Sequence, residues 1–202
     1  MTNKDALNIL RERMPQALVS DKEFRGEVTV YIVPESIKDV CRFCRDELGF
    51  DYLIDVSSVD HFGEEPRFEM VYELCILSES VHLRLKAKVS EDNPEVPTVS
   101  DIWPTADWHE REVYDMMGLR FAGHPDLRRI LMWDGYPHYP LRKDFPLQGK
   151  PTDVPNVAFT DVAPLAGGPF VTVPTDGTTQ VREPRARRAG DMPPDEDFIA
   201  EP

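Results

Sequence analysis

The sequence contains no long uninterrupted hydrophobic run. None approaches the roughly 18 apolar residues that a membrane-spanning helix needs, so we expect no membrane span. Residues 1–16, MTNKDALNILRERMPQ, lack the apolar centre of a secretory signal, and their acidic residues argue against an organelle transit peptide. We therefore expect a cytoplasmic location, either free or peripheral to a membrane.

Positive charge is also scarce. The chain has 23 Lys and Arg residues against 37 Asp and Glu residues, which gives a formal net charge of −14. Binding to a phosphate backbone is driven by Lys and Arg, so this composition argues against nucleic acid as a partner. It favours solubility and docking on a basic protein surface.

Cysteine is rare and odd in number, which argues against a disulfide framework. Cys41 and Cys44 have CxxC spacing, but a thioredoxin-type pair needs its first cysteine at a helix N-terminus. Both lie in the middle of the helix predicted at 34–49, on its apolar stripe. A structural zinc site wants four ligands, and Cys75 is the only other thiol. We expect buried, inert cysteines. The chain also lacks a Gly-rich phosphate loop, a nucleophile elbow and an iron–sulfur cysteine pattern.

Hydrophobic periodicity predicts an α+β sandwich, with a mostly antiparallel or mixed sheet and helices on one face. Helices are expected at 4–13 and 34–49. Strands are expected at 17–20, 27–33, 51–61, 67–77 and 81–89, with a charged turn near 21–26 between the first two. In the third of these strands, alternation places Tyr52, Ile54 and Val56 together on one face.

The chain divides into three parts. Residues 1–118 form the α/β domain, which ends in a helix at 106–117 that Thr105 can cap and Gly118 follows. Periodicity is lost from Leu119 onward, so residues 119–149 are expected to form an irregular segment, called here the docking ribbon. Residues 150–202 are an extended Pro-rich tail, since ten of the 19 prolines fall at 146–202. Such a tail is either disordered or wraps another subunit and orders on binding.

The helix at 106–117 carries an unusual density of charge, in Glu110, Arg111, Glu112 and Asp115. His109-Glu110 resembles the start of a metalloprotease helix, but position 113 is Val where that chemistry needs a second His. Arg111 and Asp115 are one turn apart and can pair.

These carboxylates precede four cations in largely apolar or aromatic company: Arg128, Arg129, Arg142 and Lys143. We expect helix carboxylates and ribbon cations to form a partly buried network that positions the docking ribbon. The alternative is a stand-alone enzyme that uses Glu110, Glu112 or Asp115 as acid–base groups.

Two motifs in this region resemble a known family. The first is Glu110-Arg-Glu112, then Asp115-Met-Met, His124, Arg128 and Ile130-Leu131; the second is PLRKDFP at 140–146. The combination resembles the C subunit, which is the 30 kDa-type peripheral-arm subunit, of the proton-translocating NADH-quinone oxidoreductase, respiratory complex I. Relatives occur in membrane-bound hydrogenases and related dehydrogenases, which is the alternative assembly.

The resemblance implies a non-catalytic structural subunit, with FMN, Fe–S clusters and quinone held by neighbouring subunits and no cofactor in this chain. It implies packing mainly against the quinone-site (D) subunit, with the B and I subunits, which carry Fe–S clusters, nearby and the G subunit as a further candidate. It also implies a peripheral location on the cytoplasmic side of the bacterial inner membrane. The residues that it marks as interface are Glu110, Arg111, Glu112, Asp115, His124, Arg128, Arg129, Leu141, Arg142, Lys143, Asp144 and Phe145.

Overall fold

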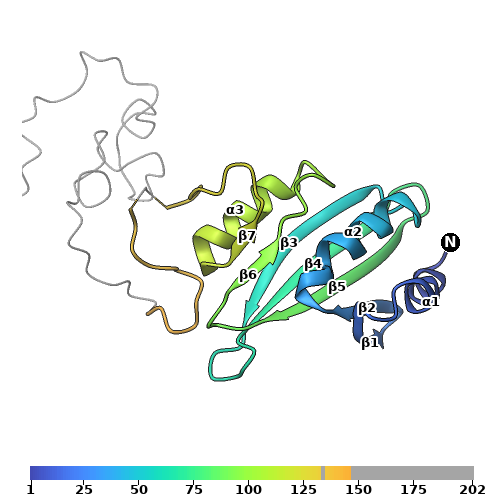
Figure 1. The fold of residues 1–202 in the computed structure, drawn as a ribbon, viewed down its shortest axis with the longest axis horizontal. Coiled ribbons are helices and arrows are strands. Elements are labelled where there is room, and N and C mark those ends of the chain that lie inside the picture. The colour runs from blue at the N-terminus through green and yellow to red at the C-terminus, as the bar shows by residue number, and fades with distance from the viewer. Residues whose placement is uncertain (133–134, 147–202) are drawn as a thin grey trace, which may run out of the picture. The chain divides into compact units, whose positions relative to one another are not determined.

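A computed structural model describes residues 1–132 and 135–146 (Figure 1). The expected tail at 150–202, and residues 147–149 of the docking ribbon, lie outside the described residues. The helices are α1 (Asn3–Arg13), a 3-10 turn η1 (Pro34–Ser36), α2 (Ile37–Asp46) and α3 (Ala106–Met117). The strands are β1 (Leu18–Phe24), β2 (Glu27–Ile32), β3 (Tyr52–Asp60), β4 (Phe68–Ile76), β5 (Val81–Val89), β6 (Glu95–Pro97) and β7 (Arg120–Ala122).

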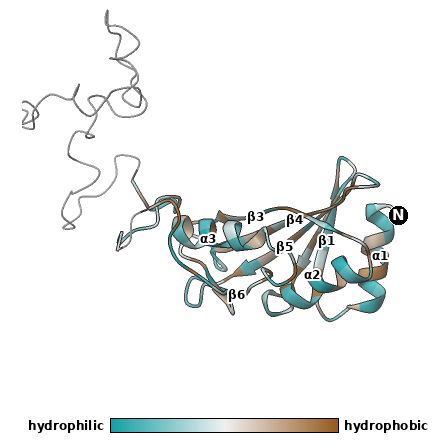
Figure 2. Cartoon of the chain, turned by 90° about the horizontal axis from the view of Figure 1, so that it is seen from above, coloured by the Kyte–Doolittle hydropathy of each residue, from teal (hydrophilic) through white to brown (hydrophobic). Residues whose placement is uncertain are grey.

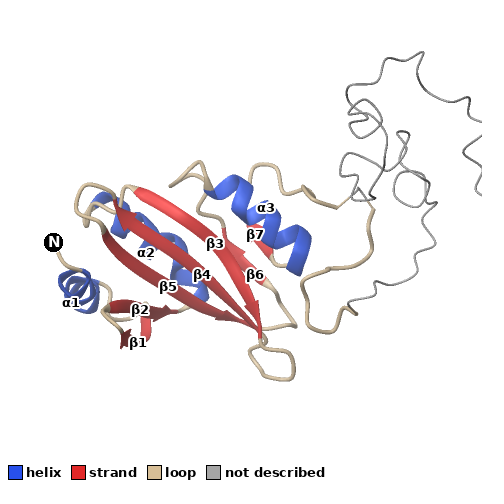
Figure 3. Ribbon diagram, turned by 180° about the vertical axis from the view of Figure 1, so that it is seen from behind, coloured by secondary structure: helices blue, strands red, loops and turns tan. Residues whose placement is uncertain are grey.

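Five strands form one mixed sheet in the order β1-β2-β5-β4-β3. Neighbouring strands are antiparallel except β2 and β5, which are parallel. Helix α2 lies across one face, and α3 lies beside β3 at the end of the sheet (Figure 1). Seen from behind, the opposite face carries no helix among the described residues (Figure 3). The expected α+β fold with a mixed sheet is confirmed.

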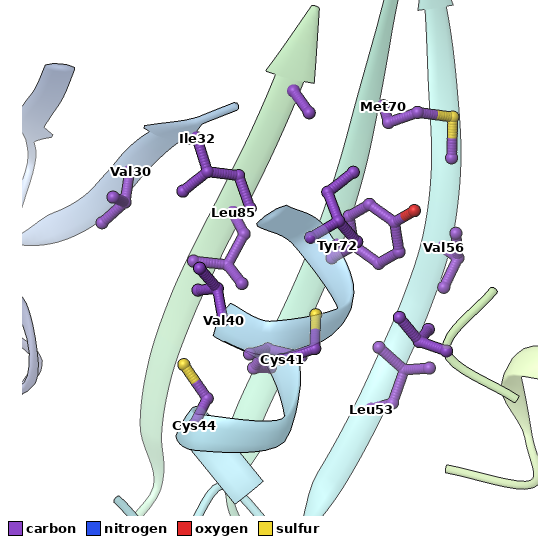
Figure 4. Packing of buried hydrophobic residues seen from close by; sticks show 14 of the residues in the cluster. Val30, Ile32, Val40, Cys41, Cys44, Leu53, Val56, Met70, Tyr72 and Leu85 are labelled. Atoms are coloured by element: carbon purple, nitrogen blue, oxygen red, sulfur yellow. The ribbon is translucent and has the colours of Figure 1, made fainter. Parts of the chain in front are cut away.

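The core lies between α2 and the sheet. Val40, Cys41 and Cys44 are fully buried and point toward Tyr72 and Leu85 on the strands (Figure 4). The interior strand β4, which lies between β5 and β3, is buried along almost its whole length, in agreement with its hydrophobic colouring in Figure 2. Within the described residues, no helix is long and apolar enough to cross a membrane.

The prediction that Tyr52, Ile54 and Val56 share one face of β3 is wrong. The register of β3 against β4 shifts between Leu53 and Asp55, so one extra residue enters the strand there. Tyr52 and Ile54 are 42% and 38% exposed, whereas Leu53 and Val56 are buried. A bulge of this kind reverses the alternation, and a strict period of two cannot predict it.

The first strand is longer than expected. Its charged end, Asp21–Phe24, pairs with β2, and the turn is confined to Arg25 and Gly26, whose φ angles are 52° and 85°. A tight hairpin turn needs positive φ, which glycine adopts without strain. The run of charged residues at 21–26 led to a predicted turn that begins four residues before the observed one.

The packed domain continues past the expected boundary at 118. Leu119 and Phe121 are buried in the core, and β7 pairs in parallel with β6, placing Phe121 opposite Val96. Three residues are too few to show a period, so the sequence did not reveal this strand. Thr105 makes no side-chain cap, contrary to expectation, but Gly118 ends α3 with a φ of 77° as predicted.

Candidate docking interface

Asp115 joins α3 to the docking ribbon. Its side chain is fully buried, and its Oδ2 accepts hydrogen bonds from the backbone N–H groups of Ile130 (3.0 Å), Leu131 (2.7 Å) and Met132 (2.8 Å). Its Oδ1 accepts from Nη1 of Arg129 at 2.5 Å. Burial raises the pKa of Asp115, but these four donors outweigh it and the net pKa is lowered. The ionised carboxylate therefore fixes the path of residues 129–132.

Arg129 holds a more distant part of the ribbon. Its Nη1 also donates to the carbonyl oxygen of Asp115 (3.0 Å), and its Nη2 donates to those of Tyr136 (2.6 Å) and His138 (3.2 Å). The guanidinium carbon lies 5.2 Å from the ring centroid of Tyr139, within cation–π range. One buried cation thus connects α3 to residues 136–139.

Arg111 does not pair with Asp115, although the helical spacing allows it. It donates instead to the carbonyl oxygens of Arg128 (3.3 Å) and Arg129 (3.5 Å) and lies over the ring of Trp108 at 5.2 Å. Both oxygens of Asp115 are occupied by the ribbon. The predicted intrahelical pair is replaced by contacts between the helix and the ribbon.

Arg142 closes the C-terminal end of α3. Its Nε donates to the carbonyl oxygen of Met117 at 2.7 Å, and its guanidinium lies over Tyr139 (4.5 Å) and Phe68 (5.1 Å). The last carbonyl groups of a helix lack intrahelical donors, so this contact satisfies one of them. Two conditions require glycine at position 118. Its φ is positive, and a Cβ there would lie 2.7 Å from side-chain atoms of Arg142 and Tyr139.

A second buried cation, Arg67, was absent from the predicted set. Its Nε and Nη2 donate to both oxygens of Asp60 at 2.8 Å, and Nη2 also donates to Asp144 at 2.7 Å. Asp60 accepts in addition from the backbone N–H of Lys143 (2.8 Å), and Arg67 reaches Glu91 at 2.6 Å. This network ties the PLRKDFP motif to the sheet. The available signal was an Arg directly before the strong strand pattern of β4, where a cation that becomes buried needs a carboxylate to balance it.

Glu110 does not face the ribbon cations. Its fully buried carboxylate accepts from Thr98 Oγ1 (2.5 Å) and from the backbone N–H of Val99 (2.7 Å), which holds α3 to the chain after β6. Burial raises the pKa of Glu110 to about 7, against the opposing effect of these hydrogen bonds. The buried ring of His124 lies nearby, with Nε2 3.1 Å from Asp107 Oδ1 and 3.8 Å from Glu110 Oε2.

The remaining predicted residues lie outward. Glu112, Arg128, Leu141, Lys143 and Asp144 are exposed, and Phe145 is half-buried with its ring centroid 5.9 Å from that of His138. Arg128 pairs with its neighbour Asp126 at 2.8 Å on the surface. The predicted set therefore divides into buried anchors and an exposed outer layer. Within the described ranges, no group of three or more His, Cys, Asp or Glu residues is placed to hold a metal ion.

Fold and anchors together define a small α+β protein that carries an irregular segment clamped to its last helix. Residues 30–151 match the family described as the respiratory-chain NADH dehydrogenase, 30 Kd subunit, and the chain belongs to this family. It is 47% identical over 147 residues to the C subunit of NADH-quinone oxidoreductase from Geotalea uraniireducens, covering 73% of this chain and 90% of that one. It is 46% identical over 162 residues to the C subunit of the same enzyme from a Roseiflexus species, covering 79% and 90%.

Many solved chains are similar to this one. A trypsin-resistant fragment of Nqo5 aligns with a TM-score of 0.54 at 30% identity, covering 60% of this chain and 98% of the fragment. A chain of the membrane-bound sulfane sulfur reductase, an archaeal respiratory membrane complex, aligns with a TM-score of 0.62 at 26% identity, covering 71% and 85%.

Proposed function

We propose that the chain is a non-catalytic structural subunit of the peripheral arm of a proton-translocating NADH-quinone oxidoreductase. The whole complex passes electrons from NADH through FMN and Fe–S clusters to quinone, and other subunits hold these cofactors. Support comes from family membership and from relatives named as the C subunit of that enzyme, which the chain matches over about nine tenths of their length.

One observation carries the structural role. Of the three acid groups proposed for catalysis, Asp115 is occupied by four donors from the docking ribbon, and Glu110 is buried against Thr98 and Val99. The third, Glu112, is exposed and has no buried acid–base partner among the described residues. General acid–base chemistry needs a group within hydrogen-bond reach of a substrate, and these buried carboxylates already serve the fold.

The partners that we propose are the quinone-site (D) subunit first, then the Fe–S-carrying B and I subunits, with the G subunit as a further candidate. The docking ribbon would present its exposed residues to the quinone-site subunit. The proposed location is the cytoplasmic side of the bacterial inner membrane, where the chain is peripheral.

A second candidate is the equivalent subunit of a related membrane-bound complex. The likeness to a chain of the archaeal sulfane sulfur reductase favours it. The co-purifying subunits discriminate the two: a flavin-carrying NADH-oxidising subunit supports the first, and a nickel–iron or sulfur-reducing subunit supports the second.

The test is affinity purification of the tagged full chain from native membranes, with size-exclusion chromatography and mass spectrometry. We expect the chain to elute in a large complex that oxidises NADH with quinone, and the chain alone to show no turnover. Elution as a free monomer would contradict the proposal. Turnover by the purified chain would favour the acid–base alternative.

A further inference from the structure

A groove lies between α3 and the last strand of the sheet. β3 pairs with β4 on one side only, and α3 lies along its other side. The floor is apolar and comprises Val56 from β3 and Val113, Met116 and Met117 from α3. Its volume is about 150 Å³, below the ~300–1,000 Å³ of small-molecule sites, so it has room for a side chain rather than a cofactor.

Two carboxylates line this groove from opposite walls. Asp55 belongs to β3 and Glu112 to α3. Glu112 forms no ion pair within the part of the chain that the structure describes, and Asp55 meets only the imidazole of His109, whose Nδ1 lies 3.3 Å away. Two carboxylates on opposite walls with no Lys or Arg between them favour a cation at the mouth of the groove.

Two further features of the walls indicate a missing contact. Leu141, on the ribbon, lines the groove and is 58% exposed. Ser58, on β3, has a buried hydroxyl oxygen without a hydrogen-bond partner among the described residues. A buried polar atom in a native protein normally has a hydrogen-bond partner. The flexible side chains of Met116 and Met117 can adapt to apolar side chains of different shapes.

We propose that this groove receives an extended segment of a partner protein that inserts one apolar side chain and places an adjacent Lys or Arg between Asp55 and Glu112. The apolar side chain packs on Met116 and Leu141, and the cation pairs with the two carboxylates. This inference rests on the proposed function, because it identifies the chemistry of the partner at the docking ribbon. It also assigns Asp55, outside both motifs, to the interface.

Photo-cross-linking in the assembled complex tests the occupant. A photoreactive benzophenone amino acid replaces Leu141 in the full chain, and Leu77, which is 59% exposed in the β4–β5 turn, provides a matched control. We expect Leu141 to cross-link to a partner peptide that has Lys or Arg within three residues of the attachment point, and Leu77 not to reach that peptide. The inference is overturned by a peptide without a cation, by no partner cross-link, or by a cross-link to residues 147–202 of the same chain.

Charge variants test the pairing. Asp55→Asn with Glu112→Gln keeps the shape of the groove, and Glu12→Gln, an exposed carboxylate on α1, is the control. We expect the double variant to release the chain from the complex at no more than half the salt concentration that releases wild type, with the control unchanged. Release at the wild-type salt concentration would refute the cation pairing. If the wild-type chain itself elutes free, the proposed function fails first, so the two failures are distinguishable.

Discussion

Oδ1 of Asp115 lies 2.5 Å from Nη1 of Arg129, and the two side chains are only 0% and 11% exposed. The pair joins the middle of α3 to the docking ribbon, and the other oxygen of Asp115 holds three consecutive backbone N–H groups. A charge buried in this way is destabilising without its partners, so the ribbon and the helix depend on each other.

Asp115→Asn should therefore destabilise the fold strongly. The amide keeps the shape but cannot accept from all four donors, and it leaves Arg129 buried without a counter-charge. Removing one member of a buried pair costs about 3–5 kcal/mol in the free energy of unfolding. Urea unfolding followed by circular dichroism measures it. The control is Glu112→Gln on the exposed face, which should change stability by no more than about 0.5 kcal/mol; equal effects of the two would contradict the anchor.

Gly118→Ala should lower the free energy of unfolding by more than Gly49→Ala does. Gly118 directly follows α3, and Gly49 lies three residues beyond the last residue of α2. Both have a φ of 77°, so both substitutions carry the same left-handed strain, roughly 1–2 kcal/mol. A Cβ at Gly49 meets nothing within 4 Å, whereas one at Gly118 meets Tyr139 and Arg142 at 2.7 Å. The difference between the two free energies of unfolding reports the contact of the ribbon with the helix end. Equal losses would mean that the ribbon does not pack there in solution.

Stability should fall between about pH 4.5 and pH 7 because of Glu110. Its pKa is raised from 4.5 to about 7 by burial, so the folded protein holds a proton there that the unfolded chain loses. The stabilising effect is complete below the unfolded pKa and is lost as pH rises through the folded pKa. Glu110→Gln should remove this slope, which is worth on the order of 3 kcal/mol. The test is to measure the unfolding midpoints of the wild type and the variant from pH 4 to pH 8. If the two proteins show the same dependence of midpoint on pH, Glu110 does not cause the slope.

Arg67→Lys should loosen the end of the ribbon without unfolding the domain. Lysine cannot reproduce the two-pronged contact with Asp60 while also reaching Asp144, so the carboxylate that holds the Lys143 amide is less well oriented. We expect the Lys143 amide to exchange with solvent at least about tenfold faster, which is 1.4 kcal/mol of protection. Arg84→Lys, on the helix-free face, should leave that amide unaffected.

Cys41 and Cys44 should resist alkylation in the native state. Burial raises the pKa of Cys44 above its usual value, and burial together with the neighbouring Cys44 raises that of Cys41. Because the thiolate is the reactive form, iodoacetamide at pH 8 should label neither until urea is added. Mass spectrometry before and after denaturation measures the labelling. Rapid native labelling of either residue would show that α2 opens readily.

The sequence by itself determined the sandwich, the helix at 106–117 and the identity of the family. Period-two and period-3.6 patterns predict β5 and α2 because each buries one face, over nine and ten residues. The same period of two predicts β4, although the structure buries both of its faces. The motif residues were likewise readable, because charged and aromatic residues with no period stand out from a foldable domain.

Tertiary structure alone decided which of these residues face each other. Asp115 pairs with Arg129 rather than Arg111, Glu110 turns to Thr98, and Arg67 joins Asp60 to the second motif. The bulge at Ile54 and the short strand β7 depend equally on neighbours far along the chain. Local patterns encode burial and propensity, whereas a buried carboxylate takes whichever donors the packed elements bring within about 3 Å. The tertiary structure therefore determines which charged side chains anchor the ribbon and which lie on the surface.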